Sequence, residues 1–177
     1  LLIANPVLPD PNFSRTVILL CNHDEQGSFG LVINRSTKLK APDLFLNINI
    51  LKSYNEKIYL GGPVSQSVVF FLCRSPSAAG KLDEVCSGVY LGSNLETLES
   101  LYASLENPEQ DIRFYLGYSG WSLKQLEDEM NTRSWIVTSY KSDNLFEYNK
   151  DLWKTILINK GGKFKAISNF PLNPVDN

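Results

Sequence analysis

The sequence predicts a single α+β domain that combines strands joined by hairpins with strands joined by helices. Its 177 residues suit one domain with its own core. The hydrophobic fraction of 43% and the charged fraction of 20% are those of an ordinary globular protein. About seven strand patterns and four helix patterns follow one another without strict alternation, which favours α+β over a doubly wound parallel sheet.

The first part of the chain predicts a proline-rich loop followed by a hairpin. The apolar residues 1–5 end at three prolines, which cannot continue a helix or a central strand. Beyond this loop, Arg15–Cys21 is typical of a buried strand and Phe29–Asn34 of a second strand. The polar segment Asn22–Ser28 between them predicts the connecting turn.

The next part predicts short elements. Pro42–Ile50 has apolar residues on one side and is typical of a short helix. Strands are expected at Lys57–Leu60, Val68–Cys73 and Gly88–Leu91, with a sharp corner at Gly61-Gly62-Pro63 and a loop at Ser75–Lys81.

A clear helix is expected at Leu95–Glu106, because leucines recur there at helical spacing. Ser93 and Glu96 have the spacing of a capping box at its start, and Asn107-Pro108 ends it. Asp111–Leu116 is then predicted to be a strand.

The last part predicts a turn, a helix, a strand and a helix. Gly117–Gly120 is expected to turn into a helix whose capping box is Ser122 with Gln125, and Trp121 and Leu126 form its hydrophobic staple. The remaining expectations are a strand at Ser134–Thr138, a helix at Leu152–Asn159 with a left-handed cap at Gly161-Gly162, and an irregular tail at Lys163–Asn177.

Charge and cysteine content narrow the functional classes. The net charge of −2 gives no general attraction to nucleic acid, so direct binding to it is disfavoured. Basic residues gather between Arg133 and Lys165, which is typical of solvated helix faces or of a docking surface for an anionic partner. The three cysteines lie in apolar contexts without CxxC spacing. Buried reduced thiols, and hence a cytoplasmic location, are expected, with no membrane span.

Four segments use proline and glycine where a plain connection would not need them. In this order they resemble the AlgH/YqgE family of bacterial proteins across nearly the whole chain. The matching residues are Leu8-x-Asp10-Pro11-x-Phe13-x-Arg15-Thr16-Val17, His23-x-x-x-Gly27-x-x-Gly30-Leu31-Val32-Ile33-Asn34, Gly61-Gly62-Pro63-Val64, and Gly117-Tyr118-Ser119-Gly120-Trp121 with the later Gln125-Leu126-Glu127 and Ser134-Trp135.

The resemblance implies a single domain over residues 1–177 with a bifurcated sheet surrounded by about four helices. It also implies a cytosolic protein with no settled enzymatic activity, and one member is linked to transcriptional regulation of alginate production. One departure is the segment Ser122-Leu123-Lys124, where the family usually has small residues after the tryptophan.

Two residues are candidates for catalysis. His23 is the single histidine, and its acidic neighbours could orient it as a general base. The same residues are also consistent with a hairpin-loop histidine that bonds to nearby backbone. Ser119 lies in a sequence similar to a nucleophile elbow, but the second glycine comes one residue early. A tight turn in which Trp121 staples the following helix is the simpler interpretation.

Two charged residues are candidates for binding. Arg15 follows the stiff proline loop, where it could form a structural ion pair with Asp10 or bind a ligand carboxylate or phosphate. Together with His23 and Asn34 these two residues lie in neighbouring hairpin elements, so a common cleft is a hypothesis.

The function predicted on these grounds is a non-catalytic ligand-binding or regulatory module, with a role in transcription as one form of it. Its candidate ligand-binding residues are Asp10, Arg15, His23, Asn34, Ser119 and Trp121. An unknown small molecule or protein is the expected partner, and no metal or cofactor is expected because the required ligand spacings and nucleotide loops are missing. The alternative is a small hydrolase that uses Ser119 or His23.

Overall fold

Apolar runs along the chain form strands that join into one nine-stranded sheet in the computed structural model, which describes residues 1–170 except for the side chain of Asp143. The strands are β1 (Leu2–Ala4), β2 (Val17–Asp24), β3 (Gly27–Val32), β4 (Ile58–Leu60), β5 (Val64–Cys73), β6 (Asp83–Cys86), β7 (Val89–Gly92), β8 (Ile112–Trp121) and β9 (Trp135–Val137). Their order is β6-β7-β5-β8-β3-β2-β1-β9, with β4 also beside β8. The predicted α+β class is confirmed.

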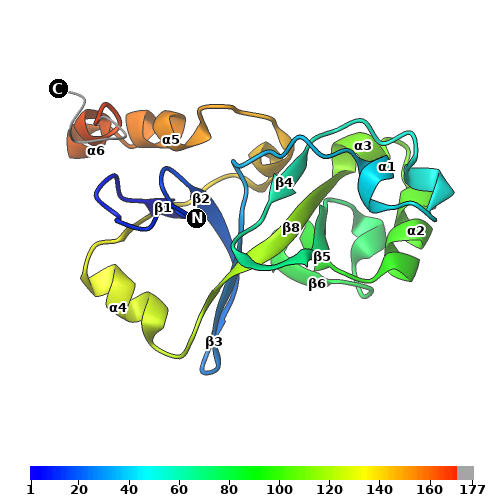
Figure 1. The fold of residues 1–177 in the computed structure, drawn as a ribbon, viewed down its shortest axis with the longest axis horizontal. Coiled ribbons are helices and arrows are strands. Elements are labelled where there is room, and N and C mark those ends of the chain that lie inside the picture. Colours follow the sequence, from blue (N-terminus) through cyan, green and yellow to red (C-terminus); the bar gives the residue numbers. More distant parts are fainter. Residues whose placement is uncertain (171–177) are drawn as a thin grey trace.

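Helices cover both ends of this sheet (Figure 1). They are α1 (Ala41–Leu44), α2 (Leu95–Ser104), α3 (Pro108–Asp111), α4 (Gln125–Asn131), α5 (Leu152–Lys160) and α6 (Gly162–Ile167). Helices α1, α2 and α3 gather at one end, whereas α4, α5 and α6 surround the end that holds β1 and β2. No helix in the described part of the chain is long and apolar enough to cross a membrane.

The sheet divides at strand β8, where Gly61 and Gly62 lie against Gly117 and Tyr118; this point is called the fork. Strand β5 pairs antiparallel with one side of β8. The other side pairs first with β4, in parallel and in the register Leu60 opposite Leu116, and then with β3, antiparallel and with Gly30 opposite Ser119. Gly61 lies where these strands part: its N–H donates to the Leu116 carbonyl, and its own carbonyl accepts the Val32 N–H, both at 2.8 Å.

The division requires backbone segments to lie closer together than side chains permit. A Cβ on Gly61 would overlap the Gly117 carbonyl oxygen, and a Cβ on Gly62 would overlap the carbonyl of Tyr118. Gly117 has φ +64°, and a Cβ there would lie 2.5 Å from the Val64 carbonyl oxygen. Glycine is therefore needed at Gly61, Gly62 and Gly117 because the backbone segments approach so closely. Gly117 also needs to be glycine because its backbone is in the left-handed conformation.

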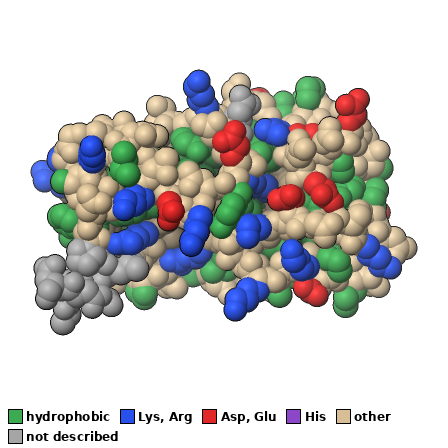
Figure 2. Space-filling view, turned by 90° about the horizontal axis from the view of Figure 1, so that it is seen from above, with side chains coloured by type: hydrophobic (Ala, Val, Ile, Leu, Met, Phe, Trp, Pro, Cys, Tyr) green, Lys and Arg blue, Asp and Glu red, His purple; other side chains and the backbone are tan. Residues whose placement is uncertain are grey.

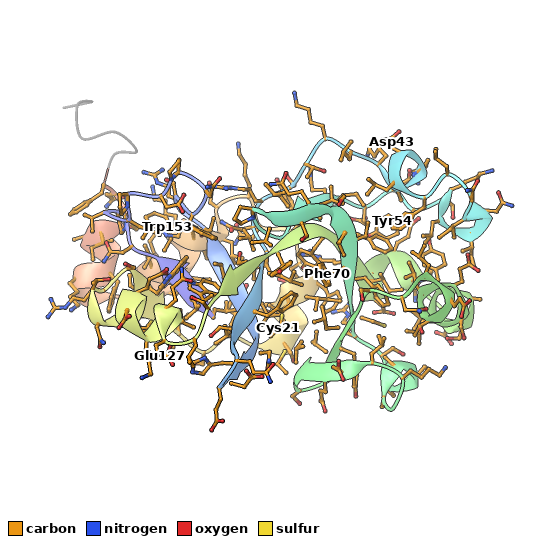
Figure 3. The ribbon with its side chains drawn as sticks, turned by 60° about the horizontal axis from the view of Figure 1, so that its bottom comes forward. Cys21, Asp43, Tyr54, Phe70, Glu127 and Trp153 are labelled. Atoms are coloured by element: carbon orange, nitrogen blue, oxygen red, sulfur yellow. The ribbon has the colours of Figure 1, made fainter. Side chains whose placement is uncertain are left out.

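The buried apolar side chains form three clusters, the smallest of which surrounds Trp121 and Trp135. One surrounds Tyr54 and Phe114, whose rings lie 4.9 Å apart, and packs under α1 and α2. Another surrounds Tyr115 and Trp153, and Trp153 donates its indole N–H to the Ala4 carbonyl at 2.8 Å. Figure 3 shows Tyr54 and Trp153 in opposite halves of the molecule.

The strongest departure from the sequence-based expectation concerns Gly117–Trp121. This segment is not a turn: it is the second half of β8, paired with β3. The glycines that suggested a turn instead allow the close approach at the fork. The helix that follows begins at Gln125 rather than at Ser122, although both the Ser122 N–H and its hydroxyl do contact the Gln125 side chain, at 3.0 and 3.1 Å.

Several smaller expectations are corrected too. The helix expected at Pro42–Ile50 is only α1 followed by a 3₁₀ turn at Asn49–Leu51, and the cap of α2 is Asn94 rather than Ser93. The strand expected at Val68–Cys73 begins at Val64. Elements that the patterns missed are the short strands β1 and β6, the short helix α3, and helix α6 within the expected irregular tail. Residues 171–177 of that tail lie outside the described residues.

The cysteines are free thiols in apolar surroundings. Cys73 is buried, whereas Cys21 and Cys86 are partly exposed. Burial raises the pKa of Cys21 to about 12 and that of Cys73 to about 11. Both thiols are therefore protonated at neutral pH and are poor nucleophiles.

The fork predicts a specific sensitivity to alanine. Gly117→Ala should lower the free energy of unfolding by about 2–5 kcal/mol, because left-handed strain of about 1–2 kcal/mol adds to the clash with Val64. Gly80→Ala is the matched control: Gly80 has φ +75°, but an added Cβ would meet no atom within 4 Å, so this variant should lose only the strain. Urea unfolding measures both; equal losses would contradict the account of the fork.

Candidate functional site

The proline loop that contains Asp10 is held by an arginine that the sequence patterns did not single out. The Arg35 guanidinium donates to the carbonyls of Asn12 at 2.6 Å, Ser14 at 3.3 Å and Pro11 at 3.4 Å. Asp10 accepts the Asn12 N–H at 2.8 Å, which closes a local turn. The loop is thus fixed by hydrogen bonds to its own backbone.

Arg15 and Asn34 also make structural contacts. Arg15 donates to the Phe170 carbonyl at 2.5 Å, and its guanidinium carbon lies 5.3 Å from the centre of the Trp153 ring. The ion pair expected between Arg15 and Asp10 is therefore not formed. The Asn34 side chain accepts the Val17 N–H at 2.8 Å and donates to the Arg15 carbonyl at 2.9 Å, which ties β3 to the start of β2.

His23 and Ser119 lie on different strands. His23 is exposed near the end of β2, and its Nδ1 is 2.8 Å from the Ser28 hydroxyl. Ser119 is fully buried in β8 and donates its hydroxyl to the Gly61 carbonyl at 3.2 Å. Because β3 lies between β2 and β8, these two strands are about 10 Å apart. The strand–turn–helix setting that a nucleophile elbow requires is absent at Ser119.

Trp121 belongs to an aromatic cluster stabilised by one carboxylate. Its indole N–H donates to Glu129 Oε2 at 2.9 Å, and the Trp135 indole donates to the same oxygen at 2.7 Å. Phe13 lies against both indoles, with ring centres 6.3 Å from Trp121 and 5.6 Å from Trp135. The cluster joins the proline loop, β8, α4 and β9. The predicted site residues thus lie in separate environments, and their role in ligand binding stays a prediction.

A hollow of about 260 Å³ lies elsewhere, where β4 and β8 begin and β5 ends. Six charged side chains line it, namely Glu56, Lys57, Arg74, Glu109, Arg113 and Glu147. Tyr59 and Phe146 also contribute to its wall. None of the residues predicted from the sequence lines this hollow.

Arg113 is the unusual member of this hollow because its side chain is only 8% exposed. Its guanidinium carbon lies 5.0 Å from the centre of the Tyr59 ring, and no carboxylate that the structure describes forms an ion pair with it. By contrast, Arg74 pairs with Asp111 at 3.0 Å. A buried cation without an opposite charge is costly, so Arg113 is the strongest candidate for contact with a ligand anion.

The strand register explains why Arg113 faces the hollow. Side chains alternate along β8, so Ile112 and Phe114 enter the core beside α2, while Arg113 and Tyr115 share the opposite face. Tyr115 pairs with Tyr59 on β4, and the Tyr115 hydroxyl is buried without a hydrogen-bond partner among the described residues. Burial raises the pKa of Tyr115 and of Tyr59, and the charge of Arg113 opposes that rise.

On the face seen in Figure 2, Lys and Arg side chains are interspersed with Asp and Glu. Among the described residues, no group of three or more His, Cys, Asp or Glu side chains is placed to hold a metal ion. One sequence signal could have indicated the hollow: an arginine stands within the apolar strand pattern Asp111–Leu116.

Comparison with known proteins gives consistent matches along the chain. A family model described as AlgH-like matches residues 1–165. A UPF0301 protein of Cytophaga hutchinsonii is 36% identical over 98% of this chain and 95% of its own length, and one of Bacteroides thetaiotaomicron is 33% identical over 100% of this chain and 89% of its own.

Two solved structures share the fold. A Corynebacterium diphtheriae protein has a TM-score of 0.78 at 19% identity and covers 96% of this chain and 90% of its own. The AlgH protein of Pseudomonas aeruginosa has a TM-score of 0.74 at 27% identity and covers 96% of this chain and 92% of its own.

The tryptophan cluster predicts that Glu129 stabilises the fold. Glu129→Ala should lower the free energy of unfolding by about 2–4 kcal/mol, because two indole N–H groups lose their acceptor. Glu127→Ala is the control, since Glu127 is an exposed carboxylate on the same helix (Figure 3) and should change stability by less than about 0.5 kcal/mol. Tryptophan fluorescence during urea unfolding reports both; similar losses would exclude a special role for Glu129.

Replacing Arg35 and replacing Arg113 should have different effects on the free energy of unfolding. Arg35→Met should lower the free energy of unfolding by about 2–4 kcal/mol, since three loop carbonyls lose their donor. Arg113→Met should leave it nearly unchanged or raise it by about 1–3 kcal/mol, because it removes a buried charge without a described partner. Thermal and urea unfolding measure both changes. If Arg113→Met lowers the free energy of unfolding by about 3 kcal/mol or more, Arg113 is a structural residue.

Proposed function

The chain belongs to the AlgH-like family of bacterial proteins, whose function is unsettled, and from that starting point we propose that it is a non-catalytic ligand-binding module of the cytoplasm. Its ligand carries an anionic group that binds Arg113 in the hollow beside β4 and β8. The observation that carries the proposal is the buried guanidinium of Arg113, which forms no ion pair with any described carboxylate.

The chemistry of the hollow suits binding better than catalysis. A guanidinium presents N–H donors in a fixed fork that matches the two oxygens of a carboxylate or phosphate. The ring of Tyr59 lies against Arg113 and limits the directions in which its guanidinium N–H groups can point. Among the described residues, those that line the hollow include no serine, cysteine or histidine that could act as a nucleophile or as an imidazole base.

A regulatory role, in transcription or in another process, is part of this proposal. Binding an anion would neutralise a charge that lies among segments distant in the sequence, namely the starts of β4 and β8 and the turn that holds Phe146. Binding of the anion in the hollow would therefore change the charge of the surface that these segments present to a protein partner. The hydrolase alternative has less support, since Ser119 is buried and bonded to Gly61 while His23 is bonded to Ser28.

A calorimetric titration with hexanoate, L-alanine and inorganic phosphate tests the proposal. At least one of these probes should bind saturably, and Arg113→Gln should weaken that binding about 10–100-fold, since hydrogen bonds to a charged group contribute about 1.5–3 kcal/mol. Lys38→Gln removes an exposed cation outside the hollow and should leave the affinity unchanged.

Two results would contradict the proposal. Binding of these probes that is equally strong in wild-type protein and in Arg113→Gln would place the anion elsewhere. Saturable hydrolysis of p-nitrophenyl acetate that Ser119→Ala or His23→Ala abolishes, with folding retained, would support the hydrolase instead.

A further inference from the structure

The hollow around Arg113 carries charges of both signs. Its lining includes the carboxylates of Glu56, Glu109 and Glu147 as well as the cations of Lys57, Arg74 and Arg113. No ion pair joins any two of these six described side chains; Arg74 is paired outside the set, with Asp111. Arg113 and the three carboxylates therefore have no ion-pair partner among the described residues and are available to a ligand.

A second hollow, of about 370 Å³, adjoins the first and is acidic. The two share Glu56, Glu109 and Gln110 in their linings. The second adds Glu106 and the side chains of Ser53 and Tyr102, and its lining includes no Lys or Arg. Arg113 is therefore the positive end of the combined site, and Glu56 and Glu109, together with Glu106, form its negative end.

These two ends point to the class of ligand. We propose, on the basis of the proposed function, that the combined site binds a small zwitterion whose carboxylate contacts Arg113 and whose ammonium group faces Glu56 and Glu109, as in a basic amino acid. A ligand with only negative charge would be attracted by Arg113 but repelled by the glutamates, and a multivalent phosphate would be repelled most.

The size of the first hollow agrees with such a ligand. Pockets for drug-sized molecules have volumes of about 300–1,000 Å³, so at 260 Å³ the first hollow, which Arg113, Glu56 and Glu109 all line, suits both ends of a smaller ligand. Its aromatic walls suit the aliphatic part of the ligand. Phe146 lies against Arg74, with 5.0 Å between the guanidinium carbon and the ring centre, just as Tyr59 lies against Arg113 at the same distance.

Three probes with similar chains separate the two charges. L-Lysine carries a carboxylate and ammonium groups, hexanoate carries the carboxylate alone, and hexylamine carries the ammonium alone. Calorimetric titration should show that L-lysine binds the wild-type protein at least about fivefold more tightly than hexanoate or hexylamine, because it gains contacts at both ends.

Matched variants assign each end. The double variant Glu56→Gln/Glu109→Gln should reduce the advantage of L-lysine over hexanoate to about twofold or less, whereas Arg113→Gln should weaken L-lysine itself about 10–100-fold. Glu96→Gln/Glu99→Gln removes two exposed carboxylates of α2 outside both hollows and should change neither value.

The outcomes distinguish this inference from the proposed function. If hexanoate binds as tightly as L-lysine and needs Arg113, the zwitterion is wrong and the anion site stands. If hexylamine matches L-lysine, the acidic hollow alone is the site and the zwitterion is again wrong. If none of the three probes binds the folded wild-type protein, the zwitterion is wrong, and the anion site stands only if inorganic phosphate or L-alanine binds and needs Arg113. If Arg113→Gln leaves the binding of every probe unchanged, both proposals fail.

Discussion

The structure depends on the close contact between two backbone segments at the fork of the sheet. Gly61 and Gly62 lie against Gly117 and Tyr118 without room for side chains, and their hydrogen bonds connect β8 to both β3 and β4. This contact sets the register of β4 on β8. The register in turn places Tyr59 beside Tyr115 and leaves Arg113 on the same face, at the edge of the sheet where the hollow lies.

Local patterns predicted those elements whose cause is local. The β2–β3 hairpin and helices α2 and α5 were found because apolar periodicity and nearby polar or glycine residues determine them. The sequence pattern predicts a turn from Gly117 to Trp121, but Gly117 is needed there for close contact with Gly61 and Gly62, more than fifty residues earlier in the chain. Strand β1 has only three residues and pairs with β2 and with the distant β9, so no local pattern indicated it. Strand β6 pairs with the adjacent β7, but two of its four residues are acidic, so it lacks an apolar strand pattern.

The candidate site was harder to predict than the fold. Asp10 and Arg15 stood out because they belong to a proline loop, and Asn34 because it ends the neighbouring hairpin, yet hydrogen bonds to backbone groups account for all three. The hollow gathers residues from four separated segments, and only the folded sheet brings them together. Arg113 alone gave a local signal, since a cation within an apolar strand must find either a partner charge or an opening to a ligand.

The central claim, that Arg113 contacts a ligand anion, can be tested directly by ¹⁵N-resolved NMR of the arginine side chains during addition of L-lysine. The account predicts that the Nε–Hε resonance of Arg113 shifts and saturates, while those of Arg15 and Arg35 stay in place because both guanidinium groups are already bonded to backbone. A saturating shift at Arg15 or Arg35 with an unchanged Arg113 resonance would contradict it.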